Sequence, residues 1–425
     1  MNAETQTVNT EGQTVSAETR PASAEAIAEP EVPVLGERRT SPVELLWDLV
    51  FVFAVTQVTT LLSRDLSWAG FGRAMLVLAL VWWAWSAFVW AANAQLETSA
   101  TLQVCLLVSS VSIFITGLSV PRAFGDEGTL FAATYAIVRF LHLGLYADAS
   151  RRGNAKWSAI AGFALTVTIG MALLLAGSFA TGALRIVLWV AAAAIDYAGP
   201  AWLTRERLRG LQRVAVAHFA ERYSLFVIIC LGESIVAIGV GALGPRADRP
   251  LSGALLAAVT LGLVTTVAMW WTYFAGLAAA AEERLRAHDD PVLAAADGYS
   301  YLHLVIVAGV ITFAVGVRVL TRDAVASPLP DPARLALCGG VALYLLGNAS
   351  FALRMVGDLE HEKLAVAGAL IVLYAVGGGL AAWVLAGGVA ALMGGLCLAE
   401  TEAMRRVISA PWRERINHPD ERMTG

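Results

Sequence analysis

The sequence predicts an all-α protein that crosses a membrane about twelve times. Of its 425 residues, 57% are apolar and only 15% are charged, whereas about 25% of residues are charged in an ordinary soluble domain. A helix that spans a bilayer needs about 20 mostly apolar residues. Between residues 43 and 400 such stretches follow one another with only short breaks. A lipid bilayer is therefore the expected surrounding of nearly the whole chain.

The apolar runs divide into twelve predicted helices. The last two share one run, 364–399, which would be about 54 Å long as a single helix at 1.5 Å per residue. We therefore expect a hairpin near Gly377-Gly378-Gly379. The predicted helices are 43–62, 71–92, 99–120, 129–148, 156–177, 183–202, 215–240, 252–277, 300–320, 334–354, 363–378 and 381–400.

The two ends of the chain have the composition of tails. Residues 1–40 are rich in Thr, Glu, Ala and Pro and lack the basic start and apolar middle of a signal peptide, so they are expected to be disordered. Residues 401–425 form a basic C-terminal tail. Basic residues accumulate in cytoplasmic loops. With twelve helices, both termini lie on the same side of the membrane. Most arginines and lysines of the loops lie on that side too, including the run Arg205–Arg213, which predicts that both termini are cytoplasmic.

An aromatic pattern occurs twice. Trp82-Trp83-Ala84-Trp85 lies late in the second predicted helix, and Trp270-Trp271-Thr272-Tyr273 lies late in the eighth. This predicts a parallel internal repeat of two six-helix halves, 41–213 and 214–400, as in some secondary transporters. The alternative is that both Trp-rich helix ends belong to interface belts.

The first helix carries acids at two depths. Ser41-Pro42-Val43-Glu44 is a capping box with proline at the first helical position, which accounts for Glu44. Asp48 lies one turn deeper on the same face, beyond the cap. Ionisable groups within a span usually face a cavity or a charged partner. Asp48 is therefore either a member of an inter-helix ion pair or a functional group. Gln57 either forms a hydrogen bond to another helix or belongs to an ion pathway.

The seventh helix has the densest polar group, with His218, Glu221, Arg222 and Glu233. Arg222 and Glu233 are eleven residues apart, so they lie on nearly the same face, about 16 Å apart in depth. Glu233 is near the middle of the span and has no role at a helix end. It is the strongest single functional candidate, and the alternative is a buried pair with an arginine of another helix.

The fourth helix places Arg139 and His142 on one face, where they are expected to meet Asp48 or Glu233. His142, His218 and His303 could relay protons, since the unperturbed histidine pKa is near 6.5, or be satisfied interior residues. Asp196 is near a span end and is expected to be solvated or interfacial.

Several classes of function are not indicated. The small net charge of -4 and the scattered basic residues argue against nucleic acid as a partner. No Walker loop, dinucleotide glycine motif, nucleophile elbow or paired-histidine zinc motif is present, so no cofactor and no enzymatic activity are expected. The four cysteines lack the spacing of a metal site or disulfide framework and are predicted to be small core residues.

The chain resembles the bacterial low temperature requirement A family over residues 38–400. The resemblance is carried by Glu44-Leu-Leu-Trp-Asp48-Leu-Val-Phe-Val-Phe-Ala-Val-Thr-Gln57 and by His218-Phe-Ala-Glu221-Arg222 through Gly232-Glu233-Ser234-Ile-Val-Ala. Trp47 stands where the family more often has Phe. The resemblance implies a protein of the bacterial cytoplasmic (inner) membrane, and the family name describes growth in the cold, not a reaction. The first helices also show a fainter likeness to two-repeat potassium channels of lysosomes and bacteria.

Three functions are consistent with these patterns. The leading hypothesis is a secondary transporter that moves a small solute or ion, with Glu233 and Asp48 as proton or cation coupling groups. The alternatives are an ion channel and a membrane accessory protein or membrane-embedded enzyme, for which Gly387-Gly388 and Gly394-Gly395 would favour tight packing or a homodimer. The candidate coupling or ion-pathway residues are Asp48, Gln57, Arg139, His142, His218, Glu221, Arg222 and Glu233.

Overall fold

The structure is a computed structural model that describes residues 40–93, 99–151, 157–199, 214–244, 252–322 and 327–417. Within these ranges every regular element is a helix, which confirms the predicted all-α fold class. Most of the predicted N-terminal tail and the basic run Arg205–Arg213 lie outside the described residues.

Eleven helical segments of the described chain are long and apolar enough to cross a membrane. The remaining predicted helix is 183–202, the sixth in chain order. It corresponds to α6 (Gly182–Ala198), which has 17 residues in the described part of the chain. The eleven segments are α1 (Pro42–Arg64), α2 (Trp68–Asn93), α3 (Ala100–Ser119), α4 (Gly128–Arg151), α5 (Trp157–Phe179), α8 (Val216–Leu243), α9 (Gly253–Phe274) with α10 (Leu277–Arg286), α11 (Pro291–Ala295) leading through a π-helix (Ala296–Leu302) into α12 (His303–Arg322), α13 (Asp331–Met355), α14 (His361–Val376) and α15 (Ala382–Asn417).

The predicted hairpin near the C-terminus is confirmed. Helix α14 ends at Val376, a single 3-10 turn covers Gly377–Gly379, and α15 begins at Ala382. The end of α14 is tied to α13, because Arg334 donates from Nε to the carbonyl of Tyr374 at 3.0 Å. The long apolar run is therefore two antiparallel helices.

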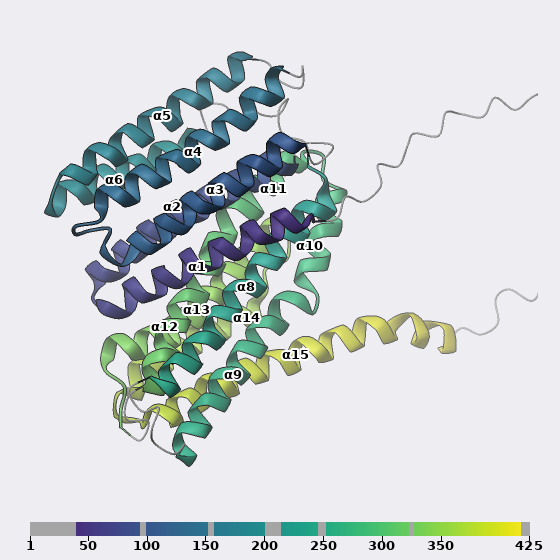
Figure 1. Cartoon of the computed structure of the whole chain (residues 1–425). Coiled ribbons are helices and arrows are strands. Elements are labelled where there is room, and N and C mark those ends of the chain that lie inside the picture. Colours follow the sequence, from purple (N-terminus) through teal and green to yellow (C-terminus); the bar gives the residue numbers. More distant parts are fainter. Residues whose placement is uncertain are drawn as a thin grey trace, which may run out of the picture. The chain divides into compact units, whose positions relative to one another are not determined.

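Helices α1 and α2 connect two groups of helices. In the first group α3 packs on α4, α4 on α5, and α5 on α6; in the second, α8, α9, α12, α13, α14 and α15 pack on one another. Figure 1 shows α4, α5 and α6 side by side. Helix α1 contacts α3 on one side and α8 and α12 on the other, while α2 contacts α4 and α6 as well as α8. The residues buried between the groups therefore come largely from α1, α2, α8 and α12.

The internal repeat remains a prediction. Its two aromatic clusters lie in different surroundings, since Trp82 and Trp85 are fully buried while Trp270 is 42% exposed. The buried indoles also have specific partners, and Trp82 donates from Nε1 to the carbonyl of Ser300 at 2.7 Å.

Glycines allow α12 and α13 to pack backbone against backbone. A methyl group at Gly309 would lie 2.4 Å from the backbone nitrogen of Tyr344, and one at Gly316 would lie 2.4 Å from that of Leu337. Small residues at helix contacts in membranes permit this close approach. Helix α12 is consequently the most deeply enclosed span of the described chain.

Candidate functional site

Asp48 and Arg222 form a buried ion pair between α1 and α8. An Nη2 hydrogen of Arg222 is donated to Asp48 Oδ1, and both side chains are almost completely shielded. Trp85 of α2 donates from Nε1 to the same carboxylate oxygen at 2.7 Å. Of the two interpretations of Asp48, the structure therefore shows the inter-helix ion pair. Its carboxylate joins α1, α2 and α8.

Glu44 does more than cap its helix. The predicted capping box with Ser41 is present, yet the Glu44 side chain is fully buried and lies 3.6 Å from Arg222 and 3.4 Å from Nε2 of His218. His218 Nδ1 lies 3.3 Å from Oδ1 of Asn93, at the end of α2. Two carboxylates, one guanidinium and one imidazole thus share a water-excluded site, where charge compensation is needed for stability.

The prediction that Arg139 meets Asp48 or Glu233 was wrong. Arg139 binds neither Asp48 nor Glu233; its Nη2 donates to Asp196 of α6 at 2.6 Å, and both side chains are buried. The expectation that Asp196 is solvated was also wrong, because its side chain is 1% exposed. Asp196 lies near the end of the apolar run, but neighbouring helices cover that end, and the sequence carries no signal of this covering.

His142 lies on the same helix as Arg139 but in an aromatic environment. Its ring contacts Phe88, Tyr146 and Phe163 at centroid distances of 4.9 to 5.7 Å. This is packing of an interior histidine between α2, α4 and α5. These aromatic contacts, and not the charged cluster around Arg222, form the surroundings of His142.

Two other candidate residues lie away from these ion pairs. Glu221 is exposed and accepts a hydrogen bond of 3.0 Å from the Thr40 hydroxyl. Gln57 is half-buried on α1, and no hydrogen bond of its side chain occurs within the described residues.

Glu233 is a buried carboxylate without a direct cationic partner. Its side chain is 4% exposed and accepts a hydrogen bond of 2.5 Å from the hydroxyl of Thr56 on α1. Among the described residues no arginine, lysine or histidine lies within ion-pair distance of it. Glu233 therefore differs in kind from Glu44, Asp48 and Asp196, which all have ion-pair partners.

A third charged cluster was missed by the sequence reasoning. Lys363 of α14 is 1% exposed and donates from Nζ to the carbonyl of Thr272 at 3.0 Å, and it pairs with Glu360 at 2.9 Å and Glu400 at 3.5 Å. Burial raises the pKa of Glu360 above its ordinary value of 4.5, and the charge of Lys363 opposes that rise. A lysine directly before a long apolar run is the signal that could have identified it.

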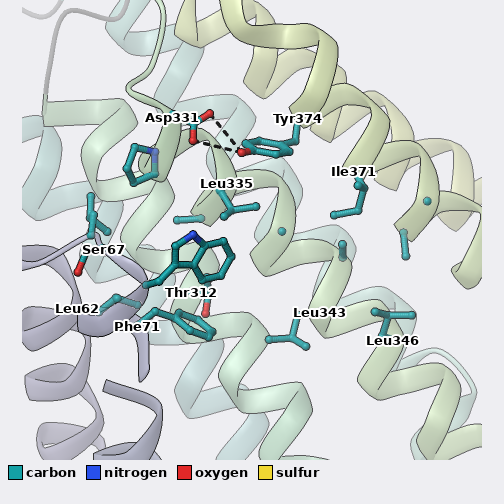
Figure 2. A pocket seen from close by; sticks show the side chains of 18 of the residues that line it. Leu62, Ser67, Phe71, Thr312, Asp331, Leu335, Leu343, Leu346, Ile371 and Tyr374 are labelled. Atoms are coloured by element: carbon teal, nitrogen blue, oxygen red, sulfur yellow. Dashed lines mark hydrogen bonds between the residues drawn. The ribbon is translucent and has the colours of Figure 1, made fainter. Parts of the chain in front are cut away.

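An apolar cavity of 740 Å³ lies beside the start of α2 and between α13 and α14. In Figure 2, Leu335, Leu343 and Ile371 line its wall, and Asp331 and Tyr374 are joined at one end by hydrogen bonds of 3.2 and 3.3 Å. None of the predicted candidate residues lines it. Such a lining suits hydrocarbon, because a charged solute placed there would lose its hydration without compensation.

Eleven membrane-length helical segments within the described residues, together with ion pairs buried between helices, define a polytopic helical membrane protein. The sequence profile described as bacterial low temperature requirement A protein (LtrA) matches residues 39–398. The chain belongs to this family, as the resemblance predicted. It is also similar to an uncharacterised protein of Rhizobium meliloti (strain 1021), with 33% identity over 282 residues that cover 64% of this chain and 67% of the relative.

Proposed function

We propose that the protein is a secondary transporter that moves a small solute or ion, and that Glu233 is the group that couples this movement to a proton or cation. One observation carries the proposal: Glu233 is a 4% exposed carboxylate in the middle of a span, held by a hydroxyl and not by an ion pair. Ionisable groups in such positions characteristically mark ion pathways and proton relays.

The contrast with the other acids supports this assignment. A carboxylate that is already paired with a buried arginine, as Asp48 is with Arg222, has its charge compensated permanently. Glu233 can bind and release a proton or a cation without breaking an ion pair. Asp48 then serves to hold α1 against α8, and Glu233 performs the coupling.

The position of Glu233 also fits alternating access. Its hydroxyl donor, Thr56, belongs to α1, which contacts the first helix group as well as α8 and α12. Transporters typically bind substrate and coupling ion near the bilayer midplane, where two helix groups rock against each other. Protonation of Glu233 would alter its bond to Thr56, and so the contact between the groups.

The test is proton and cation flux in proteoliposomes that contain the purified protein, driven by imposed gradients. Glu233→Gln should abolish coupled flux, because the amide cannot bind or release a proton, while Glu233→Asp should retain part of it. Glu283→Gln, at an exposed acid of α10, is the matched control and should transport normally. Each variant is compared with wild type for thermal unfolding and for elution as a single species.

A folded Glu233→Gln variant with full coupled flux would refute the assignment of Glu233. Electrical current that persists at a constant ohmic conductance, independent of any solute gradient, would identify a channel instead of a carrier.

A further inference from the structure

The apolar cavity of 740 Å³ beside the start of α2 is elongated along α13 and α14. On α13 its lining extends from Asp331 to Leu346, which are fifteen positions and therefore about 22 Å apart in a helix. On α14 it extends from Tyr374 back to Leu364, over about 15 Å. The hydrocarbon core of a bilayer is about 30 Å thick, so each leaflet contributes about 15 Å. The cavity therefore has the length of the acyl chains of one leaflet.

One end of this cavity is polar and the rest of its length is apolar. Asp331 and Tyr374 are hydrogen-bonded to each other at the polar end (Figure 2), and the exposed Trp68 also lines the cavity. Tryptophan and tyrosine are enriched where a membrane meets water, so this end has the character of the headgroup region. All lining residues from Leu335 to Leu346 and from Leu364 to Ile371 are apolar.

The polar group in the middle of the cavity is already satisfied. Thr312 of α12 lines the cavity, and its hydroxyl donates to the carbonyl of Ala308 on the same helix at 2.7 Å. A polar solute placed there would gain little for the hydration that it loses. A hydrocarbon chain has no such loss, and the volume is within the roughly 300 to 1,000 Å³ typical of small-molecule sites.

The cavity reaches the surface of the membrane-spanning part of the chain. Leu346 and Ile371 line the cavity and are also exposed. Gly368 lies in the wall beside Ile371, and a Cβ added there would meet no side chain or neighbouring helix of the described chain within 4 Å. An acyl chain can therefore enter sideways from the bilayer, without passing through water.

We propose that this cavity binds one acyl chain of a zwitterionic membrane phospholipid, with the headgroup at Asp331 and Tyr374 and the chain end near Leu346. The bound chain fills the space between the start of α2 and the pair α13 and α14. Helix α2 also contacts α4 and α6 of the first group. The phospholipid is thus a specific ligand that completes the packing of a helix shared by both groups.

The charges at the polar end favour a headgroup that carries an ammonium group. The Asp331 side chain is 64% exposed, whereas Arg334, which donates to it at 2.6 Å, is only 13% exposed. The guanidinium of Arg334 also lies over the ring of Tyr374, 5.1 Å from its centroid. The carboxylate is therefore the more accessible charge of this pair, and it suits the ammonium of ethanolamine. A free fatty acid would instead bring a second carboxylate beside Asp331, and like charges repel.

The test is native mass spectrometry of the purified full-length protein in mild detergent, titrated separately with phosphatidylethanolamine, phosphatidylglycerol and oleate. We expect one phosphatidylethanolamine molecule to bind more tightly than any further molecule, and more tightly than the other two probes. Gly368→Phe fills the cavity from a position with open space and should weaken this first binding step about tenfold, equivalent to about 1.4 kcal/mol. The matched control is Gly395→Phe, at a glycine of α15 that also has open space but lies outside the cavity lining.

Two further variants make the result independent of one substitution. Gly339→Leu fills the cavity from α13, where a Cβ would meet only the flexible side chain of Leu335, at 3.2 Å. It should weaken binding as Gly368→Phe does. Asp331→Asn should leave the chain bound but reduce the preference for phosphatidylethanolamine over phosphatidylglycerol several-fold. Thermal unfolding and elution as a single species check that each variant is folded.

A labelled lipid shows where the chain lies. Phosphatidylethanolamine with a photoreactive diazirine at the end of one acyl chain, incorporated in nanodiscs, should crosslink to wild type near Leu346 of α13 and Leu364 of α14. Gly368→Phe should lose these crosslinks and Gly395→Phe should keep them. Crosslinks spread evenly over the exposed helices of wild type would overturn the proposal.

Three titration results would also overturn it. The first is that wild type binds no phosphatidylethanolamine molecule more tightly than the following ones. The second is that both cavity-filling variants bind it as tightly as wild type and Gly395→Phe. The third is that oleate binds more tightly than phosphatidylethanolamine, which would assign the cavity to a free fatty acid. Glu233 does not line this cavity, so these results are independent of its proposed coupling role.

Discussion

The buried arginines Arg139 and Arg222 are stabilised by acids that are distant in sequence. Asp48 and Arg222 are 174 residues apart, and Arg139 and Asp196 are 57 residues apart. Each pair replaces the water that its charges lost, and removal of one member leaves the other uncompensated. Such residues are important for the fold whether or not they contribute to function.

We therefore expect Arg222→Met to lower the free energy of unfolding by about 3 to 5 kcal/mol, because Asp48 loses its cation. The double variant Asp48→Leu/Arg222→Met should regain part of that loss, since no unpaired charge remains at position 48. Unfolding in mild detergent, followed by tryptophan fluorescence, measures both.

The control is Arg122→Met. Arg122 pairs with Glu127 on the surface, and an exposed pair contributes about 0 to 1 kcal/mol. A double variant as unstable as the sum of the single variants would contradict the account of Asp48 and Arg222 as a coupled pair.

At the scale of helices, the sequence predicts the elements well and their contacts poorly. The capping box at Ser41 and the hairpin at Gly377–Gly379 are both local patterns, and both are confirmed. The close packing of α12 on α13 depends instead on which face each glycine presents. Gly316 faces the backbone of Leu337, whereas Gly368 of α14 has open space around it, although both are glycines inside apolar helices.

This difference predicts opposite effects for the same substitution. Gly316→Ala should destabilise the protein by about 1 to 3 kcal/mol, because the added methyl group overpacks the contact of α12 with α13. Gly368→Ala should be neutral, or stabilising by up to about 1 kcal/mol, because alanine is the better helix former. Thermal unfolding of the two variants in the same detergent decides the matter, and equal midpoints would disprove the packing argument.

At the scale of the whole molecule, the number of crossings determines on which side each loop lies. Six membrane-length segments lie between residues 125 and 358, and α6 would be a seventh crossing. If α6 crosses, as the twelve-helix prediction requires, the loop that contains Gly125 and the loop that contains Asp358 are on opposite sides of the membrane.

Cysteine labelling in intact cells tests this. With a membrane-impermeant thiol reagent, Gly125→Cys should react from outside, and Asp358→Cys should react only after permeabilisation, with the parent chain as the background control. The reverse pattern would mean that the orientation is inverted. Equal labelling of both positions would mean that α6 does not cross.

The sequence by itself determined the membrane environment, most of the membrane-length helices, and the family. These properties follow from local composition, because a chain in lipid must satisfy its backbone hydrogen bonds within each span and needs a fixed length of apolar residues to do so. Only the tertiary structure decided which acids are paired. In the sequence, Asp48 and Glu233 are both acids within apolar helices. In the structure Arg222 pairs with Asp48, whereas Glu233 is bonded by the Thr56 hydroxyl and has no ion-pair partner within the described residues. The reason is physical: ion pairing depends on distances of a few ångströms between remote segments, which helix packing sets and composition does not.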